Sequence, residues 1–138
     1  MAFIDYKKAF DSIPHSLMLK VLEIYKIHPK IIQLLSTIIP RWNINLCCGQ
    51  KSFGVINIRS GIFQGDSLSP LWFCLALNPL STILKGFNIG FEIKSASHKT
   101  NINHRLFVDD LKLYASNKDK LFRLLRVVQD FSSDISMQ

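Results

Sequence analysis

The segment Leu106–Tyr114 places two short apolar runs on either side of two adjacent carboxylates, Asp109 and Asp110. The flanking runs, 105–108 and 111–115, are rich in β-forming and aromatic residues, which predicts two strands joined at the acidic pair. A hairpin turn there puts both carboxylates at a solvent-facing tip, where aspartate tolerates unusual backbone angles. Adjacent acids repel each other unless a cation lies between them. Taken alone, the stretch is most simply an ordinary polar turn.

Length and composition limit the class of protein. The 138 residues are enough for one domain with a sizeable core and too few for two. No apolar run approaches the roughly 20 residues of a membrane span, and the N-terminal residues lack a secretory pattern, so we expect no membrane partner. The odd cysteine count, without C-x-x-C spacing, predicts a reducing compartment and free Cys47, Cys48 and Cys74.

The chain is strongly basic. Its 17 lysine and arginine residues against 10 acids give a net charge of +7, and they are spread from Lys7 to Arg126. A basic domain suggests a polyanionic partner, with nucleic acid the leading candidate. A generically basic protein without such a partner is the alternative.

Apolar side chains at helical spacing predict helices over 14–26, 28–39 and about 70–85, and a final helix starting near 116. Pro40 should end the second helix, and Pro79 should kink or break the third. We expect a turn over 7–12, with Asp11 or Ser12 capping the first helix. The second helix carries its apolar residues on one face: Ile31, Ile32, Leu35, Ile38 and Ile39.

β-forming composition predicts strands at 2–5, 42–48, 53–59 and 89–94, and a further strand in the stretch that ends at Val108. A glycine-bracketed loop, Gly61–Pro70, precedes the third helix. The resulting order of strands and helices predicts a single α+β domain over 1–138, with mainly antiparallel pairing.

In such a sheet the end of the first strand can lie beside the acidic hairpin, so that Asp5 faces Asp109 and Asp110. Converging carboxylates bind Mg²⁺ ions, which keep some waters and accept phosphate oxygens. Two ions about 4 Å apart can activate an attacking hydroxyl and stabilise a leaving pyrophosphate. The four histidines show no metal-ligand spacing, and we expect surface or packing roles for His15, His28, His98 and His104.

Three segments together resemble the central palm motifs of reverse transcriptases: FIDYKKAFDSIPH at 3–15, GIFQGDSLSPL at 61–71 and FVDD at 107–110. The likeness is greatest to the non-LTR retrotransposon branch and more distant to group II intron enzymes. It covers nearly the whole chain, with the motifs in the family's order. It implies a polymerase palm whose small antiparallel sheet packs on helices, with the fingers incomplete and the thumb absent.

The resemblance also assigns residue roles. Asp5, Asp109 and Asp110 match the catalytic, metal-binding aspartates, with the Tyr6 backbone beside the metal and the triphosphate. The implied cofactor is a pair of Mg²⁺ ions, with Mn²⁺ as a possible substitute. The implied partners are an RNA template, a DNA primer, deoxynucleoside triphosphates and the fingers and thumb regions of a longer polyprotein. The family implies an intracellular site of action, in nucleus or cytoplasm.

Two further segments match nucleotide-binding positions. Phe10 matches the bulky residue that excludes a 2′-hydroxyl, although a hydrophobe at a helix start could equally fill core. Gln64 and Gly65 match the loop that contacts the incoming nucleotide, where glycine permits close backbone approach. Asp11 and Asp66 are expected to be structural. Val108 departs mildly from the family pattern and should preserve the hairpin.

Two functions of different class remain open. The first is an RNA-directed DNA polymerase core that adds deoxynucleotides to a primer 3′ end. The second is a catalytically inactive remnant that keeps only salt-sensitive nucleic-acid binding, and we expect the isolated chain to be inactive alone. A two-metal nuclease is a weaker third possibility, because a nuclease has no need of the Gln64–Pro70 loop. We also expect uncovered apolar surface around Trp42, Phe63 and Trp72.

Overall fold

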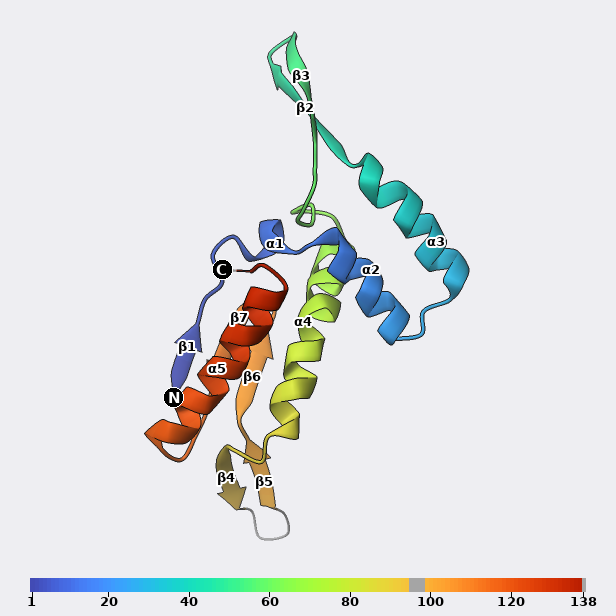
Figure 1. The fold of residues 1–138 in the computed structure, drawn as a ribbon. Coiled ribbons are helices and arrows are strands. Elements are labelled where there is room, and N and C mark those ends of the chain that lie inside the picture. Colours follow the sequence, from blue (N-terminus) through green and yellow to red (C-terminus); the bar gives the residue numbers. More distant parts are fainter. Residues whose placement is uncertain (95–98, 138) are drawn as a thin grey trace.

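The computed structural model describes residues 1–94 and 99–137, and it has the expected α+β composition (Figure 1). Its helices are α1 (Ala9–Ser12), α2 (His15–Ile24), α3 (Pro29–Ile38), α4 (Ser69–Gly86) and α5 (Lys118–Asp134), with a 3-10 turn η1 (Ile39–Arg41). Its strands are β1 (Ala2–Ile4), β2 (Asn43–Cys48), β3 (Lys51–Asn57), β4 (Phe91–Lys94), β5 (Lys99–Ile102), β6 (His104–Phe107) and β7 (Asp110–Leu113).

The central sheet has the order β1-β7-β6, and both pairings are antiparallel. Leu111 on the middle strand lies opposite Ile4 on one side and Leu106 on the other. One face of this sheet is buried, with Leu111 and Leu113 almost fully enclosed, whereas Phe3 and Phe107 on the other face are exposed. Helices α4 and α5 contact β6 and β7, so the helical layer covers one face only.

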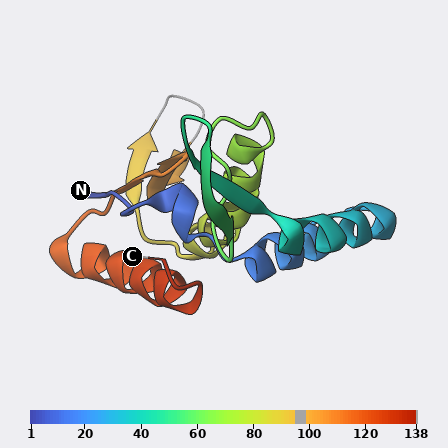
Figure 2. The same cartoon turned by 90° about the horizontal axis from the view of Figure 1, so that it is seen from above.

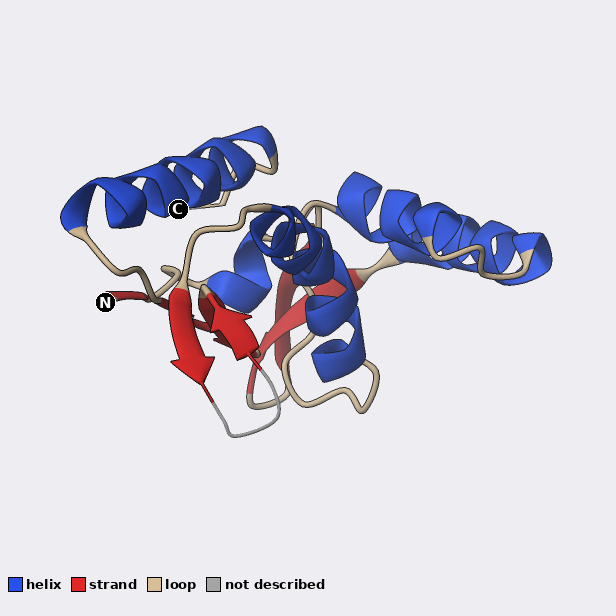
Figure 3. Cartoon of the chain, turned by 90° about the horizontal axis from the view of Figure 1, so that it is seen from below, coloured by secondary structure: helices blue, strands red, loops and turns tan. Residues whose placement is uncertain are grey.

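Helix α4 is the centre of the core. Figures 2 and 3 show it between α5 on one side and the α2–α3 pair on the other, and it contacts both α2 and α5. Four of its side chains are fully buried along one stripe: Phe73, Leu77, Leu80 and Leu84. Each such burial contributes about 1.5–3 kcal/mol.

The expected break at Pro79 is wrong, because α4 runs unbroken through it. A proline inside a helix costs about 3 kcal/mol. The buried leucines on both sides of Pro79, Leu77 and Leu80, outweigh that cost. Trp72 is also buried, 8% exposed, so the expected uncovered surface does not include it.

The segment before α2 differs from the predicted turn. Ala9–Ser12 forms the short helix α1, which follows Lys8 in a left-handed conformation (φ 50°). The Ser12 hydroxyl donates to the Lys8 carbonyl (2.9 Å), and Pro14 is the residue that precedes α2. Neither Asp11 nor Ser12 therefore caps α2. Burial of Ala9 and Ile13 in the core stabilises this local helix.

Two elements project from the body. Helix α3 has no buried residue, and its Ile31, Leu34 and Ile38 are 43–58% exposed. Within the predicted apolar face, Ile32 and Leu35 are half-buried against the core and Ile39, just past the helix, is buried, so the face is partly covered. Pro40 lies within η1 rather than directly ending α3. Beyond it, the predicted hairpin is confirmed as β2–β3, which extends away from the rest of the chain with every residue of both strands exposed (Figure 1).

Helix α5 begins at the predicted place. Asn117 is its N-cap, and the Asn117 side-chain oxygen accepts a hydrogen bond from the Lys120 backbone N–H (2.9 Å). Leu124 and Val128 are buried on the inner face of α5. Within 1–94 and 99–137, no helix has the length and apolar character required to cross a membrane.

The buried stripe of α4 generates a stability prediction. Replacing Leu77 with alanine should lower the free energy of unfolding by about 2–5 kcal/mol, because it leaves a cavity in the core. The matched control is Leu71→Ala on the same helix, where the side chain is 55% exposed and the loss should stay within about 0.5 kcal/mol. Urea denaturation measures both. Equal losses would contradict the placement of this stripe.

Candidate active site

The acidic pair lies at the tip of the β6–β7 hairpin, as the sequence predicted. Phe107 pairs with Asp110, and Val108 and Asp109 form the turn between them. The left-handed residue is Val108 (φ 54°), not either aspartate as expected. A β-branched residue with positive φ is strained. The hairpin is nevertheless preserved, and the strain is concentrated next to Asp109.

The first strand ends beside this tip. Ile4 is the last paired residue of β1 and lies opposite Leu111 of β7. Asp5 comes directly after Ile4, and Asp110 comes directly before Leu111. The backbones of Asp5 and Asp110 are thus neighbours, although 104 residues of sequence separate them. Asp5 and Asp110 are exposed, and Asp109 is half-buried.

The three carboxylates do not form a closed cluster. Asp109 lines a cavity of about 550 Å³, whereas Asp5 lines a different cavity next to α5. Across the part of the chain that the structure describes, no group of three or more His, Cys, Asp or Glu side chains is arranged to hold one ion. The donor chemistry nevertheless suits Mg²⁺, because carboxylate oxygens at adjoining strand ends are its preferred ligands.

The glycine-bracketed loop lies against the segment that follows β1. The Ile62 N–H donates to the Phe10 carbonyl (2.9 Å), and the Gly61 N–H donates to the Ile13 carbonyl (2.8 Å). Pro14 and Ser60 form an isolated antiparallel bridge. These bonds join two motifs that are about 50 residues apart in the sequence, and they set the loop above the cavity.

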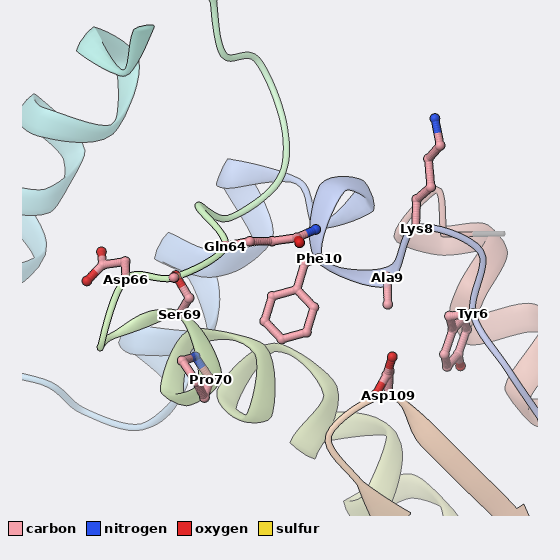
Figure 4. Close-up of a pocket in the computed structure, with 10 residues that line it drawn as sticks. Tyr6, Lys8, Ala9, Phe10, Gln64, Asp66, Ser69, Pro70 and Asp109 are labelled. Atoms are coloured by element: carbon pink, nitrogen blue, oxygen red, sulfur yellow. The ribbon is translucent and has the colours of Figure 1, made fainter. Parts of the chain in front are cut away.

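Figure 4 shows the cavity that this arrangement encloses. The Phe10 ring stacks on Phe73 (4.6 Å between centroids) and also lines the cavity, so it fills core and faces the open space at once. The Gln64 amide extends along the rim and donates to Asp11 Oδ1 (3.4 Å). The lining residues are Tyr6, Lys8, Ala9, Phe10, Gln64, Gly65, Asp66, Ser69, Pro70 and Asp109.

Asp66 and Ser69 line the cavity, but their side chains bond to the backbone around the start of helix α4. The Asp66 carboxylate accepts from the Leu68 N–H (3.2 Å), and the Ser69 hydroxyl donates to the Phe63 carbonyl. In Figure 4 the Asp66 carboxylate points away from Phe10. This agrees with the structural role expected for Asp66.

Two histidines have clear packing roles. His15 bonds through Nε2 to the Gly61 carbonyl oxygen (3.0 Å) and packs edge-on against Trp42. His104 bonds to Ser81 (2.7 Å), and burial, with a smaller contribution from Lys85, lowers the pKa of His104 below its ordinary value. His28 accepts from the Lys30 N–H at the start of α3. His98 lies outside the described residues.

Sequence reasoning missed one contact of the site. Tyr6, directly after Asp5, is buried, and its hydroxyl lies 3.1 Å from the Ser132 hydroxyl on α5. Burial raises the pKa of Tyr6, and the bond to Ser132 partly opposes that rise. No local pattern around Ser132 signals this role, because the contact depends on how α5 packs.

A small antiparallel sheet with helices on one face and acids at a hairpin tip is the architecture of a polymerase palm. The structure is similar to that of apo telomerase from Candida tropicalis truncated from its C-terminal domain, with a TM-score of 0.61. The match covers 95% of this chain and 26% of that one at 19% identity, so it bears on the fold alone.

The chain belongs to the reverse transcriptase (RNA-dependent DNA polymerase) family, which it matches over residues 1–138. It is 30% identical over 110 residues to the retrovirus-related Pol polyprotein from type-1 retrotransposable element R2 of Popillia japonica, covering 80% of this chain and 18% of the relative. It is 28% identical over 138 residues to the corresponding polyprotein from type-2 element R2DM of Drosophila melanogaster, covering 100% and 13%. The chain therefore spans less than a fifth of either relative, and the expected non-LTR retrotransposon likeness is confirmed.

The contact between the loop and α1 predicts that alanine destabilises the fold more at Gly61 than at Gly65. Gly61 and Gly65 both have positive φ, 88° and 93°, so alanine is strained at either position. A Cβ on Gly61 would also lie 2.8 Å from the Asp11 backbone, whereas one on Gly65 meets open space. We expect Gly61→Ala to lower the free energy of unfolding by about 1–3 kcal/mol more than Gly65→Ala. Equal losses in urea denaturation would show that the loop is not held against Asp11.

Proposed function

We propose that this chain is the palm of an RNA-directed DNA polymerase, which adds deoxynucleotides to a primer 3′ end on an RNA template. The observation that carries the proposal is the pairing of β1 with β7, which sets Asp5 beside the Asp109–Asp110 tip at the edge of the Phe10 cavity. Family membership supports the reaction class.

Asp5, Asp109, Asp110 and the Tyr6 backbone are the groups that would hold the two Mg²⁺ ions, or Mn²⁺ in their place. Bound there, the ions would activate the primer hydroxyl and neutralise charge on the triphosphate. The chain's own contribution is placement. The sheet holds Asp5 and Asp110 on neighbouring strands, and the strained turn at Val108 orients Asp109 into the cavity.

The cavity is where the incoming deoxynucleoside triphosphate would bind. Phe10 presents an aromatic ring that leaves no room for a 2′-hydroxyl, and its stacking on Phe73 keeps the ring in place. Gln64, Gly65 and Tyr6 also line the cavity, and the Tyr6 backbone amide would bind the triphosphate. The net charge of +7 suits the template and primer phosphates.

The longer relatives indicate what else the reaction requires. Because the chain spans 13–18% of them, regions outside these 138 residues would supply the fingers and thumb that grip the template and primer. The complete protein that carries this chain is therefore the species to assay.

The Asp109 proposal is tested by Asp109→Ala in that complete protein. We expect primer extension by the variant to fall by at least 10³-fold, because the carboxylate at the cavity is lost. Extension by the wild-type protein should stop in EDTA and return when Mg²⁺ or Mn²⁺ is restored. The control is Asp119→Ala, which removes an exposed acid from the first turn of α5 and should leave extension unchanged. Full activity of Asp109→Ala rules out the assignment. Salt-sensitive RNA binding by the wild-type protein without extension supports the binding-only alternative.

The Phe10 proposal concerns the sugar of the nucleotide. Phe10→Ala should raise the use of ribonucleotides relative to deoxynucleotides by about 10-fold or more, because the steric block is removed. Single-nucleotide primer extension with matched dATP and ATP measures the ratio. Leu68→Ala, which truncates an exposed apolar side chain within the Gly61–Pro70 loop, is the control for general damage. An unchanged ratio would leave Phe10 as a core residue only.

A further inference from the structure

The buried hydrogen bond between Tyr6 and Ser132 joins two distant parts of the chain. The hydroxyl oxygens are 3.1 Å apart, and the residues are 126 positions apart in sequence and 6% and 9% exposed. Tyr6 belongs to the connection between β1 and α1, which also carries Asp5 and Lys8. Ser132 lies in the last turn of α5. The bond therefore fixes the connection that follows Asp5 to a helix that contributes nothing else to the nucleotide cavity.

The direction of this bond follows from the second bond of Ser132. The Ser132 hydroxyl donates its single proton to the Val128 carbonyl, at 2.7 Å. The Tyr6 hydroxyl must then donate to the Ser132 oxygen. Phenylalanine at position 6 would remove this donor and keep the ring.

The connection is incompletely packed against α5. A cavity of about 590 Å³ lies between them, lined by Asp5 and Tyr6 on one side and by α5 residues including Arg126, Gln129 and Ser132 on the other. The hydroxyl of Ser12 bonds to the Lys7 and Lys8 carbonyls, but these bonds lie within the connection and α1 and move with them. Lys8 adds strain through its positive φ. The far end of the segment is held by the Ile62 bond to Phe10 and by the Phe10–Phe73 stack. The Tyr6–Ser132 bond ties the near end, directly after Asp5, to α5.

We propose that Tyr6 and Ser132 are positioning residues, which hold the Asp5–Phe10 segment in the arrangement that binds the incoming nucleotide. This inference rests on the proposed polymerase function. It gives α5 a role in nucleotide affinity although no α5 residue lines the Phe10 cavity. Neither side chain touches the reacting atoms.

The proposal predicts an effect on affinity rather than on rate. Without the bond, the segment is correctly placed for a smaller fraction of the time, and the apparent nucleotide affinity falls by that fraction. A net hydrogen bond of ordinary strength corresponds to about fivefold. A saturating nucleotide restores the arrangement, so the maximal rate should fall less than twofold. General destabilisation would instead lower the active fraction and hence the rate, with affinity unchanged.

The experiment measures single-turnover primer extension by the complete protein against nucleotide concentration. Tyr6→Phe and Ser132→Ala should each raise the apparent nucleotide Kd about fivefold, and the double variant should do no more than either, because both remove one bond. Ser133→Ala, the exposed neighbour on α5, is the matched control and should leave Kd and rate unchanged. An unchanged Kd in the two single variants, or additive effects in the double, overturns the proposal.

Hydrogen exchange separates this inference from the proposed function. In the same proteins, Tyr6→Phe should speed amide exchange over residues 7–11 about fivefold and leave exchange in the middle of α4 unchanged. If the wild-type protein does not extend primers, the proposed function fails and exchange alone decides whether the bond holds the segment. Unchanged exchange over 7–11 overturns the inference whether or not the protein polymerises.

Discussion

The antiparallel pairing of β1 with β7 is the interaction on which the site depends. It is short, three residue pairs from Ala2 with Leu113 to Ile4 with Leu111, and it joins opposite ends of the chain. Closing so long a loop costs entropy, and burial of Leu111 and Leu113 against α4 and α5 offsets that cost. The acids at the ends of these strands are placed by the apolar residues that precede and follow them.

A second long-range contact builds another side of the cavity. The 60–64 segment bonds to Phe10 and Ile13 through backbone groups, so its position depends little on the side chains that it presents. Gly61 permits this approach because a Cβ would meet the Asp11 backbone. The same contact orients Gln64 through Asp11, an acid that helps to order the site without lining the cavity. Phe10 belongs to both core and cavity, so the two alternatives considered for it are compatible.

Large apolar side chains remain exposed on three parts of the described structure. Helix α3, the β2–β3 hairpin and the outer face of the central sheet all expose large apolar side chains, among them Leu34, Phe53 and Phe107. The sequence had suggested such surface near Trp42, Phe63 and Trp72, but Trp72 is buried and Trp42 packs against Phe63 (5.0 Å between centroids). The exposed residues lie instead on the projecting elements and on the outer face of the central sheet, where Phe107 pairs with Asp110.

The sequence by itself determined the elements whose signals are local: the acidic hairpin, the apolar stripes of α4 and α5, the β2–β3 pair and the three motifs that identify the family. Only the tertiary structure decided that α4 continues through Pro79, that the apolar stripe of α3 is only partly covered, that Val108 carries the strained turn, and that Ser132 meets Tyr6. The physical reason is that periodicity and propensity act over a few residues. Burial, strain and buried hydrogen bonds are set by partners that can lie a hundred residues away.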